Sequence, residues 1–273
     1  MTRVLVSGAG GFIGSAVMRR LAADGHDPVA LRHDLLDDAS PELTSSGASH
    51  CIHAAWYTNH SDYLTHDINR QWVAASLRLE EAFRAVGGKR FIGLGTCLEY
   101  DVAHAGGPCV EGETPLRPET PYARCKLALF EALDKRSDDF AWARIFFVYG
   151  PGDRSGRLIP TMIDRFARGE EAGPTYGGLR RDYVHVDDLA GQIVRIALSG
   201  VQGAINTGTG HAPTLSEIFA AGAAAFGHSS LALANDETGG QPTLIQADMA
   251  RFRREVGETE VRDLATGIKD LTG

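Results

Sequence analysis

Residues 4–14 read VLVSGAGGFIG, and an amphipathic stretch follows them. An apolar run that breaks into glycines and resumes as a helix is typical of a strand–turn–helix unit that binds a phosphate. Gly8 allows a tight turn, Gly11 lets the backbone approach a pyrophosphate, and Gly14 lets the helix pack against the strand. Free N–H groups at the start of the helix then face the anion. The stretch predicts a dinucleotide site; the alternative is a glycine-rich turn that binds nothing.

The composition is that of an ordinary globular protein. Of the 273 residues, enough for one large domain or one and a half, 43% are hydrophobic and 23% charged. A net charge of -8 disfavours nucleic acid as the main partner. No apolar run approaches the roughly 18 residues that span a bilayer, and no secretory signal is seen, so we expect a cytoplasmic protein without a membrane partner. The cysteines form no C-x-x-C pair, so no metal site is expected; they are Cys51, Cys97, Cys109 and Cys125.

Strand-like and helical patterns alternate through the first 150 residues. Helices are expected over 69–86, ended by Gly87-Gly88, and from Pro121 to about residue 133. Strands are expected at 4–7, 29–31, 51–55, 90–94 and 142–148. This alternation predicts an α/β Rossmann fold, a doubly wound parallel sheet with helices on both faces. In such a sheet, ligands bind beyond the carboxyl ends of the strands.

The pattern changes after Tyr149, where loops lengthen and glycine and proline become frequent. We expect an NAD(P)-binding Rossmann domain from residues 1–149 plus about 182–208, and a smaller, partly interleaved substrate-binding lobe from about 150–181 plus 209–273. The stretch from Gly106 to Pro118 is expected to be a long surface loop.

The second strong signal is Tyr122-Ala123-Arg124-Cys125-Lys126. Residues four apart share one helix face, so the phenol and the ammonium lie side by side. A free tyrosine has a pKa of about 10, and a nearby positive charge lowers it, which makes the phenol a usable acid/base near neutral pH. The alternative, an ordinary exposed pair, is the weaker interpretation because the glycine turn precedes it.

Thr96 follows the strand expected at 90–94 and so belongs to the ligand edge of the sheet. Its hydroxyl can donate a hydrogen bond to a substrate oxygen, next to Tyr122. The alternative role for this threonine is to cap the turn.

With these motifs in place, nearly the whole chain resembles the extended short-chain dehydrogenase/reductases of the nucleotide-sugar epimerase/dehydratase superfamily. Many ordered matches carry the resemblance: Gly8, Gly11 and Gly14, Asp34-Leu35, His53-Ala54-Ala55, Asn69, Thr96 with Tyr100, Tyr122 and Lys126, Arg144 with Tyr149-Gly150-Pro151, the segment 181–188 (RDYVHVDD), and Asn206-Thr207-Gly208.

The resemblance implies a role for each matching residue. Tyr122 would be the acid/base, Lys126 would hold the nicotinamide ribose and depress the Tyr122 pKa, and Thr96 would bind the reacting oxygen. The other cofactor-binding residues would be Gly8, Gly10, Gly11, Phe12, Ile13, Gly14, Asp34, Leu35, Ala54, Ala55 and Asn69. The substrate would meet Thr96, Cys97, Leu98, Arg181 and Asn206, with the Arg181 segment near its pyrophosphate.

Two departures from the family pattern narrow the reaction and the cofactor. Members that dehydrate sugars carry Asp-Glu directly after the catalytic threonine, and this chain has Cys97-Leu98, so a 4,6-dehydratase is not expected. The stretch 95–100 (GTCLEY) instead resembles the G-T-C-x-E-Y of nucleotide-deoxysugar 4-ketoreductases. Where NAD enzymes place an acid for the ribose, Arg32 suits the 2′-phosphate of NADP(H). NAD(H) is the alternative, with Asp34 at the ribose and Arg32 on the surface.

The resulting prediction is an NADPH-dependent reduction of a nucleotide-diphospho-4-keto-6-deoxysugar. The alternatives are a nucleotide-sugar epimerase and, in another class, a non-catalytic dinucleotide sensor, which the Tyr122–Lys126 pair disfavours. A homodimer is also expected, joined through the helices at 69–86 and after Pro121 in a four-helix bundle. Leu129, Phe130 and Leu133 give the second helix more apolar surface than one sheet contact needs.

Overall fold

The computed structural model describes residues 1–37, 46–136, 139–153 and 156–272. Its centre is a six-stranded sheet in the order β2-β1-β3-β4-β5-β9, and every neighbouring pair is parallel. The strands are β1 (Arg3–Ser7), β2 (Asp27–Leu31), β3 (His50–His53), β4 (Arg90–Thr96), β5 (Phe140–Ile145) and β9 (Gly203–Thr207). Parallel strands need crossover connections, and helices supply them on both faces. The expected α/β Rossmann fold is confirmed.

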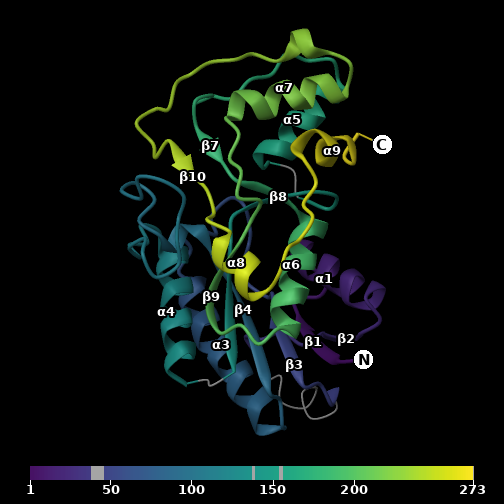
Figure 1. The fold of residues 1–273 in the computed structure, drawn as a ribbon, viewed down its shortest axis with the longest axis vertical. Coiled ribbons are helices and arrows are strands. Elements are labelled where there is room, and N and C mark those ends of the chain that lie inside the picture. Colours follow the sequence, from purple (N-terminus) through teal and green to yellow (C-terminus); the bar gives the residue numbers. More distant parts are fainter. Residues whose placement is uncertain (38–45, 137–138, 154–155, 273) are drawn as a thin grey trace.

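The helices cover the sheet in two layers (Figure 1). On one face lie α1 (Phe12–Ala23) and α6 (Val186–Leu198), and on the other lie α3 (Ile68–Ala85) and α4 (Pro121–Arg136). Successive strand residues point to opposite faces, so Val4 and Val6 pack with the first pair of helices while Leu5 packs with the second. Each helix therefore buries its apolar stripe against the sheet.

The apolar residues of α4 are largely buried by packing within the chain. Leu129 and Leu133 are 0% exposed and belong to the core between α3, α4 and the sheet. Phe130 is half-buried beside Phe140 and Trp142. The expected surplus of apolar surface on this helix is therefore smaller than the sequence suggested.

The strand expected at 142–148 is two strands in the structure. β5 ends at Ile145, and β6 (Phe147–Tyr149) pairs with β8 (Tyr183–His185) in a separate small sheet. The break falls at Phe146, whose N–H donates to the Thr207 carbonyl on β9, whereas the N–H of Phe147 donates to Asp182. The sequence shows one continuous apolar run over residues 142–148, because β5 and β6 are both largely buried, so the change of pairing partner leaves no sign in the sequence.

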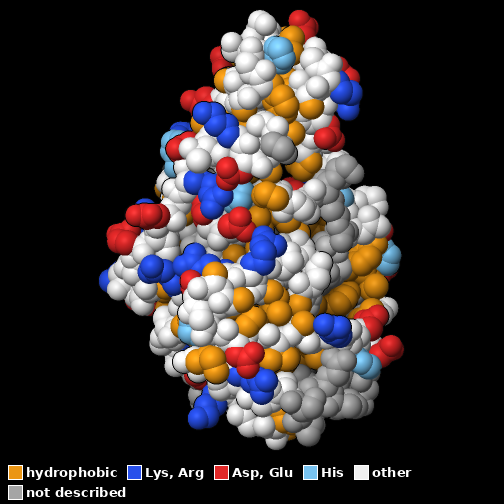
Figure 2. All heavy atoms as spheres, turned by 90° about the vertical axis from the view of Figure 1, so that its right-hand side faces the viewer, with side chains coloured by type: hydrophobic (Ala, Val, Ile, Leu, Met, Phe, Trp, Pro, Cys, Tyr) orange, Lys and Arg blue, Asp and Glu red, His pale blue; other side chains and the backbone are white. Residues whose placement is uncertain are grey.

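A smaller lobe lies above the sheet and tapers away from it (Figures 1 and 2). Its core joins Ile159, Phe166, Ile218 and Phe219. Its elements are α5 (Leu158–Ala167), β7 (Arg180–Arg181), α7 (Leu215–Ala225), η2 (Ser229–Leu231), β10 (Leu244–Ile245) and α9 (Leu264–Lys269), while α8 (Ala250–Glu255) lies lower, beside β9. The exact division of the chain into domains stays a prediction.

The stretch from Gly106 to Pro118 is anchored rather than lying free on the surface. Cys109 is 0% exposed, and its N–H donates to the Gln246 carbonyl at 2.8 Å while its own carbonyl accepts from Asp248 at 2.9 Å. Nearby, Glu111 accepts a hydrogen bond from the N–H of Asn206. The loop thus ties the C-terminal part of the chain to the edge of the sheet.

None of the helices in the described part of the chain is both long and apolar enough to cross a membrane.

Candidate active site

The turn after β1 is packed so closely that only glycine fits at its two ends. Gly8 has a φ of +68°, and an added Cβ there would lie 2.7 Å from the N atom of Ala55. At Gly14 an added Cβ would lie 2.0 Å from the Gly8 carbonyl oxygen. Gly11 forms the start of α1 and offers no side-chain cap, so the first N–H groups of the helix face the turn. This is the geometry predicted from the glycine spacing.

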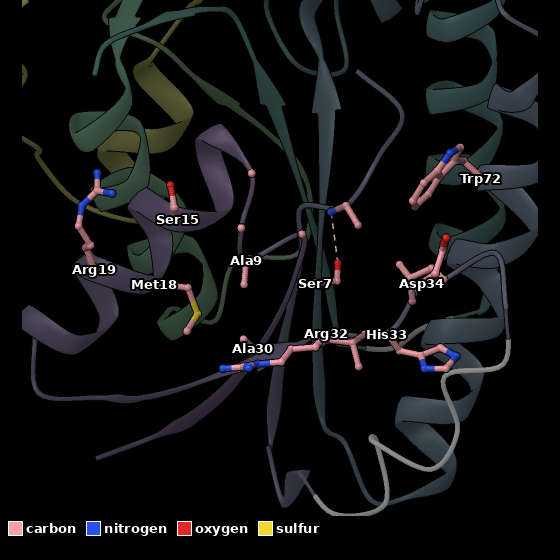
Figure 3. Close-up of a pocket in the computed structure, with 16 residues that line it drawn as sticks. Ser7, Ala9, Ser15, Met18, Arg19, Ala30, Arg32, His33, Asp34 and Trp72 are labelled. Carbon is pink, nitrogen blue, oxygen red and sulfur yellow. Dashed lines mark hydrogen bonds between the residues drawn. The ribbon is translucent and has the colours of Figure 1, made fainter. Parts of the chain in front are cut away.

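A cavity of about 750 Å³ opens on the β2 side of this turn (Figure 3). Gly10 and Gly11 line it together with the end of β2, where Arg32, Asp34 and Leu35 follow. Figure 3 shows Arg32 extending beneath Ala30 toward Met18 of α1, while Asp34 turns to the opposite side. Arg19 of α1 also lines the cavity, but its guanidinium forms an ion pair with Asp187 at 2.9 Å.

A second cavity, of about 440 Å³, lies on the other side of the turn. The sequence-predicted residues that it brings together are Phe12, Ile13, Gly14, Ala54, Ala55, Thr96, Cys97, Leu98, Tyr122 and Lys126. Both cavities are lined by Gly8, Gly11, Ala55 and Trp72. The two halves of the predicted site therefore meet at the glycine turn.

Thr96 ends β4 and begins the short helix η1 (Cys97–Glu99). Its Oγ1 accepts from the N–H of Leu98 at 3.3 Å, and its own N–H donates to Glu99 Oε1 at 2.9 Å. The Glu99 carboxylate is fully buried and also accepts from Arg144 Nε at 2.7 Å and from the Trp142 indole. Thr96 can therefore cap η1 and also contact substrate. Its oxygen accepts the capping hydrogen bond through a lone pair, and its hydroxyl proton stays available for donation.

The Tyr122 phenol is held in its protonated form. Burial raises its pKa above the usual value of tyrosine, and Tyr63, Glu99 and Cys97 act in the same direction, while a side-chain hydrogen bond with Thr96 acts against them. The pKa of the phenol is therefore raised overall in the protein on its own, and not lowered as the Tyr122–Lys126 spacing suggested. The reason is desolvation: the half-buried side chain packs its ring against Trp56 and Tyr63.

Lys126 is 4% exposed and lines the second cavity. Its Nζ donates to the Leu94 carbonyl at 2.8 Å and lies 3.7 Å from the centroid of the Trp56 ring. Burial lowers the pKa of Lys126 to about 7, although the Glu99 carboxylate acts to raise it. The amine is therefore close to its titration midpoint near neutral pH.

Three predicted site residues lie inside the fold and outside both cavity linings. Asn69 accepts from Trp56 Nε1 at 2.8 Å and donates to the carbonyls of Tyr63 and His66. Arg181 donates through Nη1 to the carbonyls of Arg180, Pro242 and Thr243. Asn206 accepts from the Tyr100 hydroxyl and donates to the Cys109 and Asp248 carbonyls. Their hydrogen bonds join loops and strand ends of the protein, and contact of Arg181 and Asn206 with substrate stays a prediction.

Sequence reasoning overlooked several cavity residues. Asp153 and Arg157 form an ion pair at 3.0 Å and both line the second cavity, where Trp56, His60 and Tyr63 also lie. The spacing of four residues between acid and base, just after Gly150-Pro151-Gly152, was the available signal for the pair. For the aromatic residues the sequence offered none, because their placement depends on how the segment after β3 folds back.

The shape of the groove fits a dinucleotide. Two cavities of about 750 and 440 Å³ join at a glycine turn, and an added Cβ at Gly10 would meet nothing within 4 Å. The helix N-terminus at this junction can receive a pyrophosphate. The residues at the turn would hold the pyrophosphate, those after β2 the adenosine half, and Lys126 the nicotinamide half.

The chain is similar to known enzymes that catalyse different reactions. It is 28% identical to a dTDP-glucose 4,6-dehydratase of Streptomyces griseus (98% of this chain, 92% of the relative), and 28% to a UDP-glucose 4-epimerase of Mycolicibacterium smegmatis (97% and 96%). It is also 28% identical to a probable dTDP-4,6-dihydroxy-2-methyloxan-3-one 4-ketoreductase of Streptomyces antibioticus (76% and 72%). Among solved structures, MoeE5 in complex with UDP-glucose and NAD is 28% identical, with a TM-score of 0.79 over 97% of this chain and 95% of that one.

A family model agrees with these likenesses and covers most of the chain. The model described as "NAD dependent epimerase/dehydratase family" matches residues 4–208, which include the glycine turn, Thr96, and the Tyr122–Lys126 pair. The chain therefore belongs to the NAD dependent epimerase/dehydratase family.

Proposed function

We propose that this protein uses NADPH to reduce the keto group of a nucleotide-diphospho-4-keto-6-deoxysugar. The observation that carries the proposal is the pair of side chains next to Thr96. Cys97 and Leu98 line the same cavity as Tyr122, and neither can serve as the extra acid and base that elimination of water needs. Leu98 has no titratable group, and burial raises the pKa of the Cys97 thiol above its usual range.

Overall similarity does not separate the reactions, because a dehydratase, an epimerase and a probable 4-ketoreductase are each 28% identical to this chain. The local residues have to decide. Residues 95–100 (GTCLEY) resemble the stretch of deoxysugar 4-ketoreductases, and one relative's name describes such an activity. The substrate class is taken from these two observations.

In this proposal the residues of the second cavity divide the work of a carbonyl reduction. When bound, a reduced nicotinamide supplies the hydride that the carbonyl carbon accepts. Tyr122 gives its proton to the carbonyl oxygen, which suits a phenol whose pKa is raised by burial. Thr96 donates a hydrogen bond to the developing alkoxide. Protonated Lys126 holds the ribose and favours the phenolate that Tyr122 becomes.

The preference for NADPH rests on the first cavity. Arg32 lines it, and a guanidinium suits a 2′-phosphate better than a free ribose hydroxyl. Asp34 lines the same cavity and would serve NAD(H) instead. A reductase consumes its cofactor and draws on the cellular pool of NADPH, which agrees with this preference.

The decisive experiment incubates the protein with NADPH and a panel of nucleotide 4-keto sugars. We expect loss of NADPH absorbance with one reduced product per cofactor, heavier than the keto sugar by two hydrogen atoms. An isomer of unchanged mass, formed without NADPH loss, would establish an epimerase instead. A product lighter by one water would refute the argument from Cys97 and Leu98.

A further inference from the structure

Trp56 contacts both members of the Tyr122–Lys126 pair. The Lys126 ammonium lies over its ring at 3.7 Å from the centroid, well within the range of a cation–π interaction. The Tyr122 ring packs against the same indole at 6.4 Å between centroids, with an interplanar angle of 80°. One side chain, 9% exposed, therefore touches the proton donor and its cationic neighbour.

The orientation of this indole is fixed from behind. Trp56 Nε1 donates to Asn69 Oδ1 at 2.8 Å, and the amide of Asn69 donates to the Tyr63 and His66 carbonyls at 2.7 and 2.8 Å. Tyr63 in turn packs edge-on against Tyr122 at 5.1 Å. Asn69 thus joins α3, the segment after β3 and the indole in one hydrogen-bonded unit.

Other groups around Lys126 do not replace the indole. Glu99 on η1 attracts the ammonium, but its oxygens accept hydrogen bonds from Thr96, Arg144 and Trp142. His53 on β3 is neutral, because burial and Lys126 lower its pKa to about 3. The Trp142 ring centroid is 6.0 Å from Nζ, and so is that of Tyr122 on the same helix.

We infer that Trp56 is a positioning residue: its face holds the Lys126 ammonium and its contact with Tyr122 fixes the phenol, so that it sets the spacing of the pair. The inference rests on the proposed function only in assigning catalysis to Tyr122 and Lys126. A cation over an aromatic face favours the charged amine, so the indole raises the proton affinity of Lys126 relative to an aliphatic neighbour.

The test compares Trp56→Leu, Trp56→Phe and the wild type in two measurements. The first is competitive acetylation of Lys126 across a pH series, read by peptide mass spectrometry, with the exposed Lys89, Lys135 and Lys269 as internal references. The second is the pH profile of kcat/KM for NADPH-dependent reduction. We expect the leucine variant to lower the Lys126 pKa by roughly one unit, the phenylalanine variant to restore most of it, and the descending limb of the activity profile to move equally.

An unchanged Lys126 midpoint in Trp56→Leu would overturn the inference, as would equal midpoints in the leucine and phenylalanine variants. If the leucine variant does not fold, fluorotryptophan incorporated into the wild type weakens the aromatic face without changing its shape. It should then lower the Lys126 pKa in the wild type and leave Trp56→Phe unaffected; an equal effect in both would place the influence at another tryptophan. The acetylation measurement needs no substrate, so it tests the role of Trp56 even if the protein reduces no keto sugar.

Discussion

Tyr122 is the residue on which the chemistry depends most directly. Its half-buried phenol lies beside Thr96 and keeps its proton near neutral pH. We expect Tyr122→Phe to retain the fold and cofactor binding and to lower kcat by roughly 10²–10⁴-fold, the usual contribution of a placed proton donor. Single-turnover reduction with saturating NADPH checks this. A variant with nearly wild-type turnover would remove Tyr122 from the mechanism.

Lys126 makes the activity depend on pH in a defined direction. Its pKa is lowered to about 7, so the ammonium is present below this value and lost as pH rises through it. The charged form favours the phenolate left after proton donation, so kcat/KM should fall as pH rises above about 7, tenfold per unit in the limit of one essential proton. A profile that is flat between pH 6 and 9 would contradict the assignment.

Arg32 carries the prediction on cofactor choice. Replacing it in Arg32→Asp removes a cation from the first cavity and places a carboxylate that repels a 2′-phosphate but can accept bonds from a 2′-hydroxyl. Loss of a charge-assisted bond of about 1.5–3 kcal/mol corresponds to roughly ten- to a hundredfold weaker NADPH binding. Titration of NADPH and NADH against both proteins measures the change.

A control for this substitution is Arg20→Ala, because Arg20 lies on α1 but pairs with Asp24 and does not line the cavity. It should leave both affinities as they are. Equal affinity of the wild type for NADPH and NADH, unaltered in Arg32→Asp, would show that Arg32 lies outside the cofactor site.

At the scale of elements, His53 joins β3 to its neighbours. Its Nδ1 is bonded to the Ser7 hydroxyl of β1 and its Nε2 to the Ser76 hydroxyl of α3, both at 2.7 Å. Burial and Lys126 lower its pKa to about 3, so the folded protein holds it neutral. An unfolded histidine takes up a proton below about pH 6.5, so the free energy of unfolding decreases as pH falls from 6.5 toward 3.

His53→Gln removes this titration while keeping a donor and an acceptor for the two serines. We expect the wild type to lose about 2 kcal/mol more unfolding free energy than the variant between pH 7 and pH 5. Urea unfolding at the two pH values measures it. The same loss in both proteins would mean that His53 is already protonated in the folded state or that other groups dominate.

The elements that bind the dinucleotide could be predicted from the sequence because short-range rules place them. A glycine turn between an apolar strand and a helix has one common geometry, and Tyr122 and Lys126 share a helix face by spacing alone. The break between β5 and β6 could not be predicted, because it arises from a change of pairing partner within a buried run. Trp56 was missed for the same kind of reason, because long-range packing of the segment after β3 brings it to the cavity, whereas Arg157 had a signal in its spacing from Asp153.

Charges were the least predictable part of the site. The sequence placed Lys126 beside Tyr122 and implied a lowered phenol pKa, but burial outweighs that attraction and reverses the direction. Arg181 shows the same limit, since the sequence cannot show that its Nη1 donates to three backbone carbonyls. The desolvation of Tyr122 and the backbone partners of Arg181 both depend on how the two lobes pack together.

At the scale of the whole molecule, α3 and α4 pack side by side on one face of the sheet (Figure 1). Leu129 and Leu133 are fully buried in the core of the chain, so they are not available for a dimer interface as the sequence suggested. Half-buried apolar side chains remain along both helices, among them Val73, Leu77 and Phe130. Two such faces can bury each other in a four-helix bundle around a two-fold axis.

The prediction is a homodimer that a charge on α3 disrupts. Leu77→Lys would place an ammonium in the bundle, where its desolvation is costly, and should convert the dimer to a monomer at micromolar concentration. Leu198→Lys is the matched control, since Leu198 is 37% exposed at the end of α6 on the other face of the sheet and should leave the mass unchanged. Light scattering after size exclusion gives the masses, and circular dichroism confirms that each variant is folded. A wild type of monomeric mass would refute the dimer outright, whereas a dimer that survives Leu77→Lys would place its interface away from α3 and α4.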